Sequence, residues 1–116
     1  MRLASAPRLG NRNFALVGKN APTRSVGALL VAPAAAAIYR GSDPLGNGLV
    51  VYVDVLNHST VLIEGLASDT AGQWQMPAPL PSDPALADMK IVMQSLFRDS
   101  NNGKLASSNG LEFRIR

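Results

Sequence analysis

The chain has 116 residues, a length that suits one domain with its own hydrophobic core. Charged residues make up only 16% of it, and it has no cysteine, which excludes a disulfide framework and a thiolate metal site. The formal net charge of +3 is uneven, because residues 1–40 carry six basic and no acidic residues, whereas residues 41–116 carry five basic and eight acidic ones. The basic residues of the first third are spread singly among few aromatic residues, so nucleic acid is not the expected partner.

Residues 1–12 are rich in Arg, Ala and Pro and show no periodicity. They predict an extended basic arm, followed by a single β-sandwich domain over residues 13–116. The arm carries Arg2, Arg8 and Arg12 and no acid, while residues 41–116 have a net charge of −3. We therefore expect the arm to lie on a neighbouring copy of the chain, with its three arginines as candidate contact groups.

Short apolar runs separated by turn residues follow the arm. They predict strands at residues 13–17, 25–31, 49–56, 60–66, 73–76, 89–98 and 110–116. Residues 49–56 and 60–66 are expected to form a hairpin, and the alanines of 34–37 an irregular or single helical turn. Residues 77–84 contain four prolines, so they cannot pair regularly and should cross from one sheet to another.

The stretch of residues 89–98 has the clearest period of two. One face carries apolar residues, and the other carries Lys90, Gln94 and Arg98 and should be partly wet. We expect one shared core made of Met89, Ile91, Met93, Phe97, Val51, Val53, Val55, Leu111, Phe113 and Ile115. Seven or eight short strands with this patterning predict an all-β, single-domain antiparallel β-sandwich that is jelly-roll-like, with an open barrel as the main rival.

Catalytic patterns are weak. His58 is the only histidine, and a Ser-His-Asp arrangement would have to recruit Ser59 or Ser107, but no nucleophile-elbow pattern surrounds any serine. A solvent-exposed turn histidine is the interpretation that we favour. Asp54 and Glu64 would face each other across the predicted hairpin, as the two carboxylates of a glycosidase do across a cleft, but a pair of exposed strand carboxylates is favoured.

Ligand-binding patterns are also few. The loop of residues 99–103 has side-chain oxygens at alternate positions and a glycine, which suits calcium, yet it lacks a closing bidentate acid. We favour an ordinary polar hairpin loop and expect no metal or other cofactor. Trp74, the only tryptophan, is either a carbohydrate-stacking platform or a plug in the core, with the plug favoured. Tyr52, on the same strand as Asp54, is a further candidate contact for a ligand or partner.

The order of short motifs along the chain resembles a known module. The motifs are Leu9-Gly10-Asn11, Asn13-Phe14, Ala21-Pro22, Asp69, Gly72, Pro79-Leu80-Pro81, Pro84, Leu86, Gln94 and Ser108-Asn109-Gly110-Leu111. Over nearly its whole length the chain is similar to a β-sandwich module found near the C-termini of secreted proteins from planctomycetes and myxobacteria. It departs from the module at Asp88 and Met89, where Gly and an aromatic residue are expected. The resemblance implies an extracellular, non-catalytic sandwich and carries over no functional residue.

Together these features predict a non-catalytic extracellular structural protein, with no enzyme activity. Its sandwich would self-associate into a filament, sheet or coat through the N-terminal arm and strand edges. The alternative is an extracellular module that binds a glycan or a partner protein through Trp74, Tyr52 and the polar loops. No secretory signal is visible, and the most apolar run, residues 26–38, is too short to span a bilayer. An exported form would therefore have lost its signal or used another route.

Overall fold

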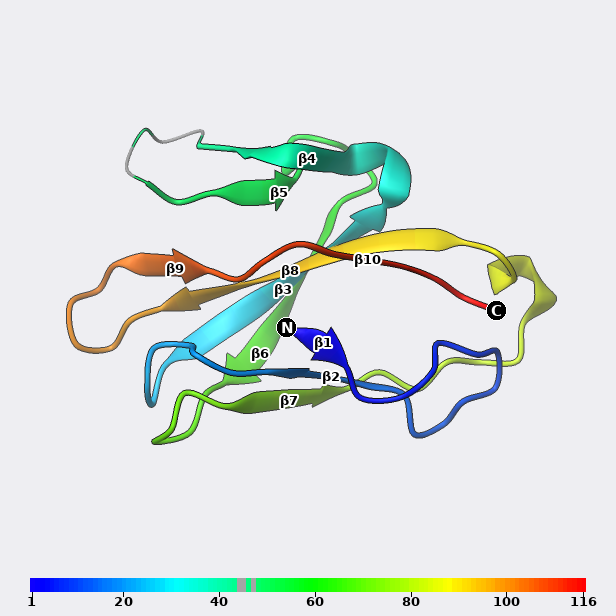
Figure 1. Cartoon of the computed structure of the whole chain (residues 1–116), viewed down its shortest axis with the longest axis horizontal. Coiled ribbons are helices and arrows are strands. Elements are labelled where there is room, and N and C mark those ends of the chain that lie inside the picture. The colour runs from blue at the N-terminus through cyan, green and yellow to red at the C-terminus, as the bar shows by residue number, and fades with distance from the viewer. Residues whose placement is uncertain (44–45, 47) are drawn as a thin grey trace.

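The chain forms three antiparallel β-layers (Figure 1). The computed structural model describes every residue except 44, 45 and 47. Within the described residues there are ten strands and two short 3-10 turns, η1 (Ala34–Ala36) and η2 (Pro84–Leu86). The predicted all-β antiparallel sandwich is confirmed, with ten strands in place of seven or eight. None of the helices in this part of the chain has the length and apolar character needed to cross a membrane.

The middle layer, which we call the main sheet, has the strand order β10-β8-β3-β6. Its strands are β3 (Val26–Pro33), β6 (Val61–Ala67), β8 (Lys90–Arg98), β9 (Leu105–Ser107) and β10 (Leu111–Arg114). β9 and β10 follow each other along the same edge of β8, so β8 has strand partners on both sides along most of its length. Residues of β3 and β8 that face opposite sides of the sheet are both buried, because a further layer covers each face.

The small sheet covers one face of the main sheet. It contains β1 (Arg2–Leu3), β2 (Ala15–Gly18) and β7 (Trp74–Pro77), with β2 in the centre. The buried residues between these two sheets are Leu16, Leu29, Leu66, Trp74, Met93 and Phe97. The rings of Trp74 and Phe97 lie 6.0 Å apart, and those of Phe14 and Phe113 lie 5.7 Å apart. This layer pair is the sandwich that the alternation in residues 89–98 predicted.

The opposite face of the main sheet is covered by a two-stranded ribbon of β4 (Ala37–Ser42) and β5 (Val51–Val53). A second apolar cluster lies beneath it, made of Leu30, Ala32, Ala36, Val51, Val53 and Val92. The predicted hairpin of residues 49–56 with 60–66 is therefore wrong, since β5 pairs with β4 and β6 pairs with β3. A turn at Asp54 and Asn57, held by the Asn57 N–H donating to the Asp54 carbonyl oxygen, leads the chain from the ribbon to the main sheet.

The expectation of one shared core is wrong, because the ribbon covers a second apolar cluster on the other face of the main sheet. Val51 and Val53 lie in the cluster under the ribbon, apart from Met93 and Phe97. Met89 and Val55 are 39% and 48% exposed, because each lies just outside a strand. Ile91, Leu111 and Phe113 do pack against the cluster between the sheets, and Ile115 is buried.

The expectation of a partly wet face on residues 89–98 is also wrong at Gln94, which is fully buried. Its side-chain oxygen accepts from the Tyr52 N–H at 2.8 Å, and its amide donates to the carbonyl oxygens of Val50 and Ser108 at 2.9 Å. The bonds to Tyr52 and Val50 connect β8 to the ribbon strand β5 and the residue before it, and the bond to Ser108 connects β8 to the segment between β9 and β10. The amide is therefore satisfied without water. Lys90 and Arg98, at the two ends of the strand, are exposed as predicted.

Residues 1–12 lie along their own chain. β1 pairs with β2, placing Arg2 opposite Val17. Further on, the Leu9 N–H donates to the carbonyl oxygen of Arg116, and the Arg116 N–H donates to that of Pro7. Leu3 packs against the cluster between the sheets. The segment is thus held by main-chain hydrogen bonds at both ends, although most of its length has no regular secondary structure.

Candidate functional site

The largest group of solvent-facing apolar side chains in the described part of the chain surrounds β6. Nine large apolar residues are exposed in the described part of the chain as a whole, and five of them fall between residues 55 and 63. Those five are Val55, Leu56, Val61, Leu62 and Ile63. On β6 itself Val61 is 55% exposed, Leu62 53% and Ile63 36%. An apolar run of this kind normally indicates a buried strand, so its exposure needs a physical explanation.

β6 is exposed because it is the outermost strand of the main sheet, and Leu66 is its only residue in either buried cluster. Val61 and Ile63 stand opposite Val31 and Leu29, on the face that the small sheet covers elsewhere, whereas Leu62 lies on the ribbon face. Gly65, with φ of +108°, forms a bulge at which the pairing shifts by one residue. Only beyond this bulge does the strand turn a side chain inward, at Leu66, which is 3% exposed.

The outer edge of β6 has no strand beside it among the described residues, since β6 pairs only with β3. Natural sheets protect such edges with lysine, arginine, proline or inward charges. Several other edge strands include such residues, for example Arg2 in β1, Pro77 in β7 and Arg114 in β10, whereas the three-residue strands β5 and β9 do not. β6 has seven residues, of which Glu64 is the only charged one. It is therefore an open, apolar strand edge, which we call the β6 edge.

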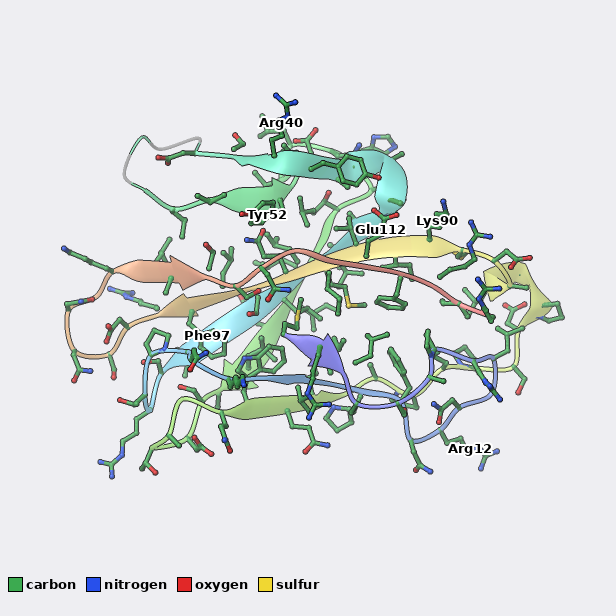
Figure 2. All side chains as sticks on the ribbon, viewed as in Figure 1. Arg12, Arg40, Tyr52, Lys90, Phe97 and Glu112 are labelled. Atoms are coloured by element: carbon green, nitrogen blue, oxygen red, sulfur yellow. The ribbon has the colours of Figure 1, made fainter. Side chains whose placement is uncertain are left out.

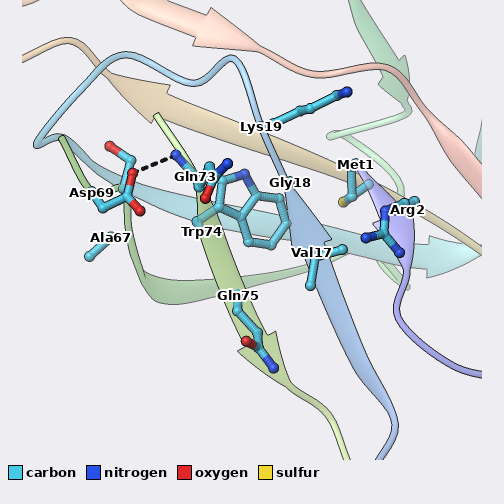
Figure 3. Close-up of a pocket in the computed structure, with 11 residues that line it drawn as sticks. Met1, Arg2, Val17, Gly18, Lys19, Ala67, Asp69, Gln73, Trp74 and Gln75 are labelled. Atoms are coloured by element: carbon cyan, nitrogen blue, oxygen red, sulfur yellow. Dashed lines mark hydrogen bonds between the residues drawn. The ribbon is translucent and has the colours of Figure 1, made fainter. Parts of the chain in front are cut away.

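A first hollow lies beside the small sheet, with a volume of about 720 Å³ (Figure 3). Trp74 forms its wall, but the indole is only 6% exposed, in agreement with the favoured interpretation as a plug. A Cβ atom at position 18 would overlap the indole, so Gly18 allows β2 to pass directly over Trp74. Arg2 and Lys19 border the hollow on the outside. The Asp69 carboxylate accepts from the Gln73 N–H at 2.8 Å, which holds the adjoining turn.

A second hollow of about 270 Å³ lies between the ribbon and β10, lined by Tyr39, Tyr52 and Glu112. Tyr52 and Glu112 are labelled in Figure 2. Tyr39 is 78% exposed, and its hydroxyl bonds to Glu112. This hydrogen bond, with the negative charge of the carboxylate, raises the pKa of Tyr39 above its ordinary value of 10.0. Tyr52 is held in place by the close backbone of Gly41 and Gly110, at each of which a Cβ atom would overlap Val50 or Tyr52.

The structure separates the carboxylates of the predicted pair. Asp54 follows β5 in the ribbon layer, where its carboxylate accepts from the Leu56 N–H at 3.0 Å. Glu64 lies on β6 in the main sheet. The glycosidase-like arrangement depended on the hairpin that does not form, so the two side chains share no strand pair. His58 is exposed in the turn before β6, as favoured.

The remaining candidates also lie apart. Arg8 and Arg12 are exposed, and Arg12 projects from the surface away from both hollows (Figure 2). In the loop of residues 99–103, the Asp99 carboxylate accepts from the Asn101 N–H at 2.9 Å. The Gly103 N–H donates to the Asp99 carbonyl oxygen at 2.8 Å, which is the geometry of a tight polar turn.

Among the described residues no group of three or more His, Cys, Asp or Glu side chains is placed to hold a metal ion. Comparisons with protein-family models, with curated proteins and with solved structures find no match. The surface itself is therefore the basis for a functional assignment. Its most unusual feature is the β6 edge, whose residues the sequence pattern predicted to pair with residues 49–56 in a hairpin. The missed signal was the lack of alternation in Val61-Leu62-Ile63, where neither face carries a polar residue.

Proposed function

We propose that the protein is a non-catalytic structural subunit that self-associates through open strand edges, with an extracellular filament, sheet or coat as the setting. The β6 edge carries this proposal. An exposed apolar strand with free main-chain hydrogen-bonding groups is a template for another strand. Pairing would satisfy those groups and would also cover Val61, Leu62 and Ile63. The extracellular setting is supported by the resemblance to the secreted sandwich module.

The N-terminal arm has a smaller part in this proposal than the β6 edge. Arg2 and Leu3 already pair with β2, and the backbone near Pro7 and Leu9 already bonds to Arg116 within one chain. These main-chain groups are thus occupied, and surface arginines alone give weak, salt-screened contacts. Association through the arm would require it to exchange between copies. Association through β6 requires no rearrangement of the chain.

The proposal is tested by introducing a charge on the β6 edge. Lysine in place of Val61 should weaken association at least about tenfold, because lysine on a strand edge opposes pairing with another strand. Val26→Lys is a matched control, since Val26 is 67% exposed but lies on β3, which is paired on both sides. Sedimentation equilibrium over a range of concentrations measures the dissociation constant, and electron microscopy shows any extended assembly.

The expected pattern is association of the wild-type chain and of Val26→Lys, with loss in Val61→Lys. A wild-type protein that stays monomeric at millimolar concentration would refute the proposal. Equal weakening by both substitutions would show that added charge, and not the β6 edge, controls association. Circular dichroism of each variant checks that the sandwich remains folded.

The hollow beside Tyr52 supports a second candidate function, binding of a glycan or peptide. Two tyrosine rings and a carboxylate converge there on an apolar floor, a combination of apolar surface and few polar groups that is typical of ligand sites. Tyr39→Ala removes the most exposed of these rings and should abolish binding. Titration of a panel of oligosaccharides, followed by the NMR signals of the two tyrosines, tests this candidate. Unchanged signals throughout the panel would contradict it.

A further inference from the structure

We propose that the partner of the β6 edge is the β6 edge of a second copy, paired antiparallel about a two-fold axis that passes beside Ile63. This inference rests on the proposed function, because it names the partner and the geometry of the same surface. It would join two main sheets into one continuous sheet across the dimer, and a filament, sheet or coat would grow from such dimers through other open strand edges. Three independent constraints in the structure select this arrangement: the direction of the backbone groups, the turn before β6, and the charge of Glu64.

The direction of the backbone groups follows from the ladder across the main sheet. The Ile115 N–H donates to the Met89 carbonyl oxygen, and the Ser108 N–H donates to that of Ser95. The backbone N–H and C=O groups of odd-numbered residues in β8 therefore point towards the β9 and β10 side. Even-numbered residues of β8 therefore point towards β3, because the direction alternates along a strand. Leu30 stands opposite Gln94, so the backbone groups of Leu30 point towards β8. Those of Leu29 and Val31 point the other way, towards β6.

The same alternation gives the direction of the groups on β6. Leu29 stands opposite Ile63, and Val31 stands opposite Val61. Because the backbone groups of these two β3 residues point towards β6, those of Ile63 and Val61 point back towards β3. The backbone N–H and C=O groups of Leu62 and Glu64 are left pointing outward. An independent bond agrees with this assignment, because the Ser68 N–H donates to the Ser25 carbonyl oxygen on the same side of the ladder.

Only registers that bring outward-pointing residues opposite each other form a ladder. An axis at Ile63 places Leu62 opposite the second copy's Glu64 and Glu64 opposite the second copy's Leu62, giving about four main-chain hydrogen bonds. An axis at Leu62 would need Thr60, whose N–H already donates to the Asn57 carbonyl oxygen. An axis at Glu64 would place two carboxylates directly opposite each other, which is destabilising.

The side chains suit the axis at Ile63. The two copies of Ile63 would form a pair without hydrogen bonds, in which Cα atoms lie about 4.5 Å apart and side chains approach most closely. Val61 would face the Gly65 bulge of the second copy, so the extra residue leaves room and causes no clash. Parallel pairing of the two β6 edges in register would instead place Glu64 beside the second copy's Glu64. The antiparallel pair thus covers the apolar side chains without opposing like charges.

The absence of cysteine makes the register directly measurable by cross-linking. In Ile63→Cys, oxidation should produce a disulfide-linked dimer at least about tenfold faster than in Val26→Cys, since the Cα separation of the pair lies within the range of disulfides. Leu62→Cys alone and Glu64→Cys alone should cross-link no faster than Val26→Cys. A mixture of these two variants should give the mixed dimer, because the two positions face each other.

Each outcome decides between arrangements. Fast cross-linking confined to Ile63→Cys and to the mixed pair supports the two-fold axis at Ile63. Equal cross-linking of Ile63→Cys, Leu62→Cys and Glu64→Cys would show parallel in-register stacking and overturn it. Absence of cross-linking in a protein that sedimentation shows to be oligomeric overturns the geometry and leaves the proposed function standing. Absence of both cross-linking and oligomers overturns the two together.

Discussion

Gln94 should be one of the most sensitive polar positions in the protein. The change Gln94→Met keeps the length of the side chain and removes the amide that bonds to Tyr52, Val50 and Ser108. Each buried polar group that loses its partner costs about 1–3 kcal/mol. Because the three partner residues are half-buried, the expected loss is at the lower end of the sum for three groups, about 3 kcal/mol. Roughly 6–17 kcal/mol is the stability typical of a chain of this length, so the loss is large.

Urea titration measures this loss, and the fluorescence of Trp74 reports unfolding because that side chain is the only tryptophan and is buried. Gln75→Met is the matched control, since Gln75 lies exposed on β7. It should change the free energy of unfolding by less than about 0.5 kcal/mol. A loss below about 1 kcal/mol in Gln94→Met would refute the conclusion that this amide holds the ribbon to the main sheet.

A second substitution at the same position gives a pH-dependent result whose sign is fixed by the contacts. In Gln94→Glu, burial and the carbonyl oxygens of Val50 and Ser108 favour the protonated carboxyl, so its pKa in the folded state rises above the unfolded value of about 4.3. The protonated form can still donate to one carbonyl oxygen. This variant should therefore be most stable below the unfolded pKa and lose stability as the pH rises through the folded pKa. Stability that increases with pH over that range would contradict the burial of this side chain.

Two further predictions concern aromatic residues. Phe113→Ala should cost about 3 kcal/mol in the same urea titration, because Phe113 packs on the cluster between the sheets and its ring lies 5.7 Å from that of Phe14; a loss near zero would show that the ring is exposed. Glu112→Gln should lower the pKa of Tyr39 towards its ordinary value by removing the charge of its hydrogen-bond partner, and the absorbance of tyrosinate during alkaline titration measures this change. An unchanged titration curve would contradict the Tyr39–Glu112 contact.

The period of two in residues 89–98 predicted a central strand, and Ile91, Met93 and Phe97 indeed share a face. What the pattern could not reveal was a second covering layer. Gln94 looks solvated when only alternation is considered, because a buried glutamine is distinguishable from a wet one only by its partners. Those partners come from residues 50, 52 and 108, and no local pattern connects them to β8. Because the pattern does not reveal the ribbon as a separate layer, it predicts one core for Val51, Val53 and Met93, whereas the two valines lie in the cluster under the ribbon.

The β6 edge was missed for a related reason. Neighbouring strands usually pair, so residues 49–56 and 60–66 were joined as a hairpin across a short turn. The true partner of β5 is β4, which begins in the alanine run that suggested a turn. Because β5 pairs with β4, β6 has β3 on one side and, within the described part of the chain, no strand on the other. The exposed character of Val61, Leu62 and Ile63 is thus a consequence of topology, and composition alone gives no sign of it.

The strand order of the main sheet has a consequence during synthesis. β3 and β6 can pair as soon as residue 67 has left the ribosome, but the other side of β3 needs β8, which starts at Lys90. Until then both long edges of this two-stranded sheet are bare, and two paired strands are barely stable alone. Non-local pairing of this kind folds slowly and is prone to aggregate. A nascent chain stalled before residue 90 would lack Met93 and Phe97 of β8, which complete the cluster around Leu29, so we expect chaperones to bind such a chain near Leu29.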